Sequence, residues 1–174
     1  MSNFQTCSGI MLTALVLSLL ACQPSAECLA LVQAQTELTT QLKKHHQTWE
    51  KIFNESQIDL INAELFADTV TFSGTPAPSV GIAALKAYYQ NYLTGFSNID
   101  FSVNSAIGQS DKIANHWTFR GKHSGEFFGA PASGYDIMIS GLTLAKLKGG
   151  KIVAIEVFYD NLSLRRQLGL IPLD

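Results

Sequence analysis

Hydrophobic and polar residues alternate over residues 116–123, and this period of two predicts a β-strand. Trp117, Phe119 and His123 share one face of the strand, whereas polar or charged side chains occupy the other face. Because the face with Trp117 and Phe119 is apolar, we expect it to look into the core or into a cavity, with His123 at the end of the row.

Two further strands are expected downstream, over residues 135–147 and 151–159, because both runs are rich in β-branched and apolar residues. A glycine-rich turn over 124–134 precedes the first of them, and a Lys-Gly-Gly turn separates the two. Consecutive strands with such short connections form an antiparallel meander. A short helix is expected to follow over 162–168.

The first half of the chain predicts a layer of helices with two strands. On the first helix, apolar residues recur every three or four positions, and His45 lies on this stripe. A later helix carries Tyr88, Tyr89 and Tyr92, which we interpret as packing residues at the edge of the core. The expected elements are a helix over 27–53, a helix that follows an N-cap at Ser56 and ends at Phe66, a strand over 69–72, a helix over 82–93 and a strand over 99–105.

The N-terminus has the pattern of an export signal. Residues 9–21 form an apolar run that is too short for a bilayer span of about 20 residues but has the length of a signal-peptide core. The run ends in Leu-Leu-Ala followed by Cys22, which resembles the bacterial lipobox. This resemblance implies cleavage before Cys22 and lipidation of its thiol. A plain secreted protein is the alternative, since residues 1–8 contain no Lys or Arg.

We therefore divide the chain into a signal peptide (1–21), a tether with a helix extension (22–38) and a folded domain (39–174). Lipid on Cys22 would anchor the domain in the bacterial cell envelope. Gln23 after the cysteine resembles the sorting pattern for the outer membrane, which implies its periplasmic face.

Cysteine usage predicts no disulfide in the lipidated protein. Cys7 leaves with the signal peptide, so Cys28 is then the only free thiol. If Cys22 is not lipidated, a Cys22–Cys28 disulfide becomes an option in an oxidising compartment.

Composition narrows the class of protein. The chain has 174 residues, 15% of them charged, and a formal net charge of −2, so it lacks the basic balance typical of nucleic-acid binders. The sequence contains no phosphate-binding glycine loop and no His, Cys, Asp and Glu spacing typical of metal ligands. We expect a single domain with no metal and no cofactor.

Four short motifs carry a family resemblance. They are Gly-Lys-His-Ser-Gly-Glu-Phe-Phe-Gly-Ala-Pro (121–131), Gly-Lys-Ile-Val (150–153), Asp-Asn-Leu (160–162) and Gln-Leu-Gly (167–169). In this order and spacing they resemble the SnoaL-like polyketide cyclase, or ester cyclase, family of the NTF2-like superfamily. The resemblance reaches back more weakly to about Thr39. It implies an α+β cone, in which a curved antiparallel sheet wraps over N-terminal helices and encloses an apolar pocket.

In such a pocket, burial shifts the pKa of a carboxylate or histidine toward neutrality and so supports acid–base chemistry. His123 and Asp160 are the candidate catalytic residues. Each also has a structural reading, in which His123 closes the turn after its strand and Asp160 caps the last helix. The candidate ligand-binding residues are Trp117, Phe119, Tyr135 and Ile139.

The resemblance also implies which acid–base positions this chain has changed. The cyclases of the family place an aspartate three residues before the position matched by Asp160, and that residue is Val157. They place a histidine on the preceding strand, at the position matched by Thr143. Because neither side chain ionises, the aldol cyclisation of those enzymes is not expected.

We therefore expect a membrane-tethered domain that binds a small apolar or aromatic molecule in its cone. One alternative is a cyclase, isomerase or hydratase that uses His123 and Asp160. The other is a protein-interaction module that forms a homodimer through the outward face of the last strands, since the resemblance implies that such sheets often dimerise.

Overall fold

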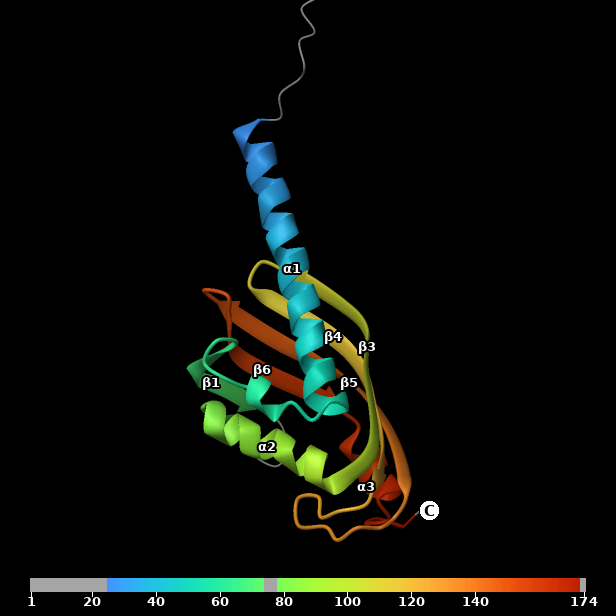
Figure 1. Ribbon diagram of the computed structural model, residues 1–174. Helices are drawn as coiled ribbons and strands as arrows, with labels where there is room; N and C mark the ends of the chain where they lie inside the picture. Colours follow the sequence, from blue (N-terminus) through green and yellow to red (C-terminus); the bar gives the residue numbers. More distant parts are fainter. Residues whose placement is uncertain (1–24, 74–77, 173–174) are drawn as a thin grey trace, which may run out of the picture.

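The structure is a computed structural model that describes residues 25–73 and 78–172 (Figure 1). The residues around Cys22 lie outside these ranges. The elements in chain order are α1 (Ala26–Asn54), η1 (Ile58–Leu60), β1 (Phe66–Ser73), β2 (Ser79–Val80), α2 (Ile82–Gly95), β3 (Phe96–Gln109), β4 (Lys112–His123), β5 (Asp136–Lys148), β6 (Lys151–Tyr159) and α3 (Asn161–Gln167).

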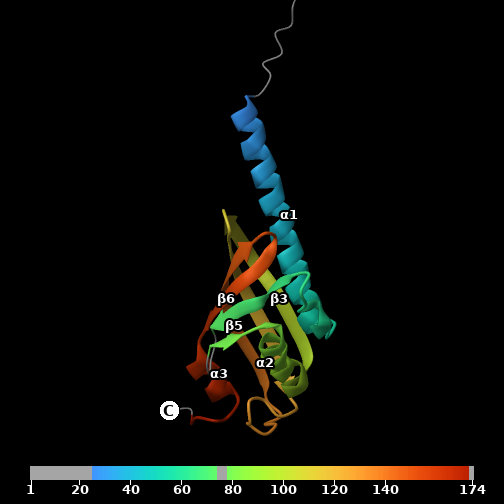
Figure 2. The same ribbon diagram turned by 90° about the vertical axis from the view of Figure 1, so that its left-hand side faces the viewer.

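Six strands form one curved sheet in the order β2-β1-β6-β5-β4-β3. The sheet wraps around the second half of α1 and around α2, and α3 lies at the end of β6 (Figures 1 and 2). The predicted α+β class and the meander of β4, β5 and β6 are confirmed. The sheet is not wholly antiparallel, because β1 runs parallel to β6. No hairpin joins these two strands, so their connection does not force them to be antiparallel.

The first helix has two parts with different surroundings. Residues 25–37 are all exposed and project beyond the sheet (Figures 1 and 2), whereas His45, Trp49 and Ile52 are buried against it. The helix crosses β3 at Gly108, where an added Cβ would lie only 2.8 Å from Leu38 Cδ1. A glycine at this point therefore allows helix and strand to approach closely. Among the described residues, no helix is both long and apolar enough to cross a membrane.

The predicted helix between Ser56 and Phe66 is wrong, because only the short 3₁₀ turn η1 forms there and β1 begins at Phe66. The side chain of Asn62 explains the difference. Its Nδ2–H donates to the Asp59 carbonyl at 2.9 Å, and its Oδ1 accepts from the Glu64 N–H at 2.9 Å. Asparagine thus binds backbone groups that would otherwise extend a helix.

Candidate functional site

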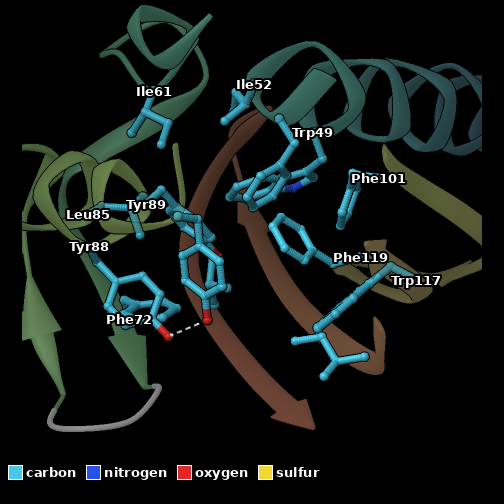
Figure 3. Close-up of a cluster of buried hydrophobic side chains, with 14 of the residues drawn as sticks. Trp49, Ile52, Ile61, Phe72, Leu85, Tyr88, Tyr89, Phe101, Trp117 and Phe119 are labelled. Carbon is cyan, nitrogen blue, oxygen red and sulfur yellow. Dashed lines mark hydrogen bonds between the residues drawn. The ribbon is translucent and has the colours of Figure 1, made fainter. Parts of the chain in front are cut away.

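A cavity of about 40 Å³ lies between the concave face of the sheet and the two large helices. At 10–15 Å³ per water centre, it has room for roughly three water molecules. Figure 3 shows how aromatic rings from α1, α2, β3 and β4 gather around this space. The cavity is lined by Trp49, Phe53, Tyr88, Tyr89, Tyr92, Phe101, Val103, Asn115, Trp117, Phe119, Ile139, Thr143 and Val157.

The strand residues of the wall are arranged in rows across the sheet. Asn115 on β4 pairs with Thr143 on β5, which pairs with Val157 on β6. Phe119 pairs with Ile139 in another row. Because side chains of directly paired residues point to the same face, each row projects into the cavity.

Helix α1 also fixes the position of the β3 wall residue Phe101. The Asn54 side chain accepts a hydrogen bond from the Phe101 N–H at 2.7 Å and donates one to the Phe101 carbonyl at 2.9 Å. The Phe101 ring then stacks on Phe53, with ring centroids 4.6 Å apart. Asn54 thus completes two backbone hydrogen bonds of β3, and the aromatic pair covers one side of the cavity.

Three tyrosines of α2 supply most of the opposite wall. The hydroxyl groups of Tyr88 and Tyr92 are 3.4 Å apart. Tyr89 packs on Trp49 with ring centroids 4.7 Å apart (Figure 3). Burial is the main cause that raises the pKa of all three phenols above the ordinary value. They are therefore neutral at physiological pH and act as ring surfaces with hydroxyl groups, rather than as bases.

A polar cluster reaches the cavity from α1. The indole Nε1–H of Trp49 donates to His45 Nε2 at 3.1 Å, and His45 Nδ1 lies 2.7 Å from the side-chain amide of Asn115. Burial, together with the neighbouring charge of His46, lowers the pKa of His45 from 6.5 to about 4. His45 is therefore a neutral, hydrogen-bonded residue behind the cavity wall.

The four predicted ligand-binding residues separate into two groups. Trp117, Phe119 and Ile139 are buried and lie on the cavity wall. Tyr135 lies outside the cavity, and its side chain is 57% exposed. Tyr135 directly precedes β5, whereas Ile139 lies within the strand under the helices. The aromatic side chain of Tyr135 therefore lies too close to the end of β5 to reach the cavity.

His123 is fully buried but does not line the cavity. Its Nδ1 accepts a hydrogen bond from the Ser133 N–H at 3.2 Å and lies 3.0 Å from Ser133 Oγ. Its ring centroid is 5.4 Å from that of Phe96. Burial lowers the pKa of His123. These contacts fasten the loop between β4 and β5, which is the structural role expected as the alternative for His123.

Asp160 is exposed and serves as the N-cap of α3, where its Oδ1 accepts from the Ser163 N–H at 2.9 Å. Asp160 follows Tyr159 at the end of β6. Tyr159 pairs with Gly141 on β5, and Gly141 pairs with Trp117 on β4. His123 lies six residues beyond Trp117 on β4. This offset corresponds to about 20 Å along the strands. His123 and Asp160 therefore lie far apart along the sheet.

Sequence reasoning missed much of the cavity wall, including Asn115 and the helix residues Trp49 and Phe53. The sequence pattern could have identified Asn115, because it lies two positions before Trp117 and therefore on the same face of the strand as Trp117 and Phe119. A polar residue in such an apolar row points to a specific hydrogen bond. Within the described parts of the chain, no three His, Cys, Asp or Glu side chains gather closely enough to hold a metal ion.

The model of the SnoaL-like polyketide cyclase family matches residues 43–168. The chain therefore belongs to the SnoaL-like polyketide cyclase family. The sequence has no match among the curated proteins. The structures below share its NTF2-like fold, but at their sequence identities they establish the fold alone.

TsrD from Streptomyces laurentii is 20% identical with a TM-score of 0.69, and the match covers 76% of this chain and 97% of TsrD. A SnoaL-like polyketide cyclase from Agrobacterium tumefaciens is 16% identical with a TM-score of 0.60, covering 74% and 98%. A Catenulispora acidiphila protein with a ketosteroid isomerase-like fold is 18% identical with a TM-score of 0.58, covering 72% and 92%. Its structure is a complex with trimethylamine.

Both positions that the resemblance matches to acid–base residues of the cyclases lie on the cavity wall. Val157 and Thr143 are direct neighbours in the row that begins at Asn115. Thr143 Oγ1 accepts a hydrogen bond from the Trp117 indole at 2.9 Å. This chain thus has apolar and hydroxyl groups at the two positions, and the described residues that line the cavity include no acid, histidine or lysine.

Proposed function

We propose that this domain binds a small apolar or aromatic molecule in the cone cavity and holds it without acid–base turnover. The observation that carries the proposal is the composition of the wall, which combines aromatic rings with a few hydroxyl and amide groups. Among the residues that the structure describes, the wall includes no ionisable acid or base other than the neutral tyrosines. Such walls are typical of small-molecule binding sites. The missing acid–base pair at Val157 and Thr143 favours binding over the aldol chemistry of the family's cyclases.

The size of the cavity restricts the ligand. A dry cavity of roughly 150 Å³ can hold benzene, and this one measures about 40 Å³. A molecule of a few heavy atoms fits with little adjustment, whereas a larger aromatic ring requires the wall to move. Val103 and Val157 are the half-buried members of the wall. The trimethylamine in the Catenulispora acidiphila structure is a small ligand of this order.

Ligand retention tests the proposal. We expect native mass spectrometry of the gently purified protein to show an added small mass. Val157→Phe fills the cavity and should abolish the added mass, whereas the control Val80→Phe, at a position that is 64% exposed, should keep it. The proposal fails if the wild type carries no added mass and its melting temperature does not respond to millimolar phenol, indole or trimethylamine.

We propose further that the domain is anchored through lipid on Cys22 at the periplasmic face of the bacterial outer membrane. The projecting part of α1 supports this, since residues 25–37 are all exposed and begin three residues after Cys22. At 1.5 Å per residue, they form a stalk of about 20 Å. Metabolic labelling with a fatty-acid analogue should mark the wild type and Cys28→Ser but not Cys22→Ser. Labelling of Cys22→Ser would contradict the anchor.

A homodimer is a second proposal, supported by apolar residues on the outer face of the sheet. Leu142 and Phe158 lie directly opposite each other on β5 and β6 and are 38% and 52% exposed. Met138 and Leu144 lie on the same outer face of β5 and are also exposed. Light scattering should give a dimer mass for the wild type and the control Val80→Glu, and a monomer mass for Phe158→Glu. A monomeric wild type would overturn the proposal.

A further inference from the structure

A chain of buried hydrogen bonds leads from α1 to the cavity wall and ends at an incompletely bonded amide. Trp49, His45 and Asn115 are only 5%, 5% and 2% exposed. Trp49 Nε1 lies 3.1 Å from His45 Nε2, and His45 Nδ1 lies 2.7 Å from one terminal atom of the Asn115 amide. The other terminal atom of this amide is buried and has no hydrogen-bond partner among the described residues.

The chemistry of the three side chains fixes the direction of each bond. A tryptophan indole can only donate, so His45 Nε2 accepts and carries no proton. Burial keeps His45 neutral, since it lowers the pKa to about 4. A neutral imidazole whose Nε2 is bare carries its proton on Nδ1. His45 Nδ1–H is therefore a donor and needs an acceptor in Asn115.

Only the carbonyl oxygen of the Asn115 amide can accept this hydrogen bond. The structure has Nδ2 of Asn115 facing His45 Nδ1 and Oδ1 without a partner. The oxygen and nitrogen of an amide are assigned from their surroundings, and an end-for-end flip of this amide pairs the His45 Nδ1–H with Oδ1. The amide nitrogen then occupies the other position, where no protein group pairs with it. Asn115 lines the cavity beside Thr143 and Val157, and the unpaired end of its amide is the end away from His45.

We propose that Asn115, oriented by His45 and Trp49, is the polar anchor of the cavity and donates a hydrogen bond to a carbonyl oxygen of the bound molecule. The ligand class is thus a small ketone, aldehyde or related carbonyl compound with an apolar body. This inference rests on the proposed binding function and adds the group that the ligand must carry. His45 is a positioning residue, because it acts through the Asn115 amide.

The orientation of the amide can be measured without any ligand. In NMR spectra of the full chain, His45 should show an unprotonated Nε2 and a protonated Nδ1. The Asn115 side-chain amide protons should give stronger NOEs to the methyl groups of Thr143 and Val157 than to the His45 ring. A His45 tautomer with its proton on Nε2, or amide protons directed at His45, would overturn the proposal.

Acetone and isobutene test the selectivity, since they have nearly the same shape and differ in a C=O or C=CH₂ group. A donor left unpaired in a buried site costs enough to predict at least a tenfold preference for acetone in the wild type. Asn115→Leu should remove this preference and keep isobutene binding. Asn104→Leu is the matched control, because Asn104 is exposed on β3 and bonds to Thr118, and it should bind as the wild type does.

The possible outcomes distinguish a failure of the Asn115 anchor from a failure of the proposed binding function. Equal binding of acetone and isobutene to the wild type, or an acetone preference that persists in Asn115→Leu, would overturn the anchor and leave the binding function intact. Binding of neither compound at millimolar concentration would overturn the binding function, and the anchor with it. If Asn115→Leu does not fold, the NMR orientation and the wild-type preference still decide the proposal.

Discussion

The indole of Trp117 donates a hydrogen bond to Thr143 Oγ1 at 2.9 Å, and both side chains belong to the cavity wall. Trp117 pairs with Gly141, so the bond runs diagonally to the residue two positions along β5. Thr143 occupies the position that the resemblance matches to a histidine of the cyclases. In this chain Thr143 holds Trp117 in place and cannot act as a base, which agrees with the proposed binding function.

Thr143→Val should destabilise the fold, because it leaves the buried Trp117 N–H without its acceptor. We expect a loss of about 1–3 kcal/mol in the free energy of unfolding, measured by urea denaturation. Thr143→Ser keeps the hydroxyl group and should lose less. Thr71→Val, at an exposed position on β1, should change stability by no more than about 0.5 kcal/mol. Equal losses for Thr143→Val and Thr143→Ser would show that the hydrogen bond does not matter.

Gly141→Ala should disturb the cavity through Trp117. An added Cβ would lie 2.3 Å from Trp117 Cζ2 and 2.6 Å from the Phe158 carbonyl oxygen, so the indole has to move. We expect a cost of about 1–3 kcal/mol for this overpacking. In a Trp117→Phe background, the shorter ring removes the clash with the indole and should lower the cost. A double-mutant cycle in urea measures this coupling, and strictly additive effects would contradict it.

The alternation of side chains correctly predicted which face of β4 is buried, because one apolar face is buried along the whole strand. Trp117 and Phe119 are therefore assigned to the inner face from the sequence alone. How far along the strand the cavity lies could not be deduced in the same way. His123 shares the face but lies six residues beyond Trp117, under the β4–β5 loop. The helices that close the cavity decide which part of the row lines it.

The helix contribution to the site was harder to predict for a physical reason. Tyrosines at helical spacing pack at the edge of a core in many proteins, and only the folded structure places Tyr88 and Tyr92 on the cavity wall. Likewise, the sequence places His45 on the apolar stripe, four residues before its partner Trp49, but its second partner is distant in sequence. Asn115 is 70 residues away, and their contact depends on how α1 crosses the sheet.

The buried His45 predicts a loss of stability in acid. Its pKa is lowered to about 4 in the folded protein and is 6.5 as the ordinary value, so the unfolded chain binds the proton first as the pH falls. Stability is therefore fully present above about pH 6.5 and is lost progressively down to about pH 4. The shift corresponds to about 3 kcal/mol. Urea unfolding as a function of pH measures this loss.

Histidine variants test whether His45 causes the loss of stability at low pH. His45→Gln should flatten the stability profile between about pH 6.5 and 4, at the cost of a lower stability at neutral pH. A smaller slope should persist, because burial also lowers the pKa of His123. His116→Gln is the control at an exposed position and should retain the wild-type profile. A His45→Gln profile as steep as that of the wild type would contradict the argument.

Asp160 should matter for stability and not for binding, because its carboxylate caps α3 away from the cavity. Asp160→Ala leaves the Ser163 N–H without its acceptor and should cost about 1 kcal/mol in urea unfolding. Asp160→Ser supplies another capping oxygen and should recover most of this loss. Both variants should retain the same small molecule in native mass spectra. Loss of that ligand in the folded Asp160→Ser protein would instead give the carboxylate a direct role in the site.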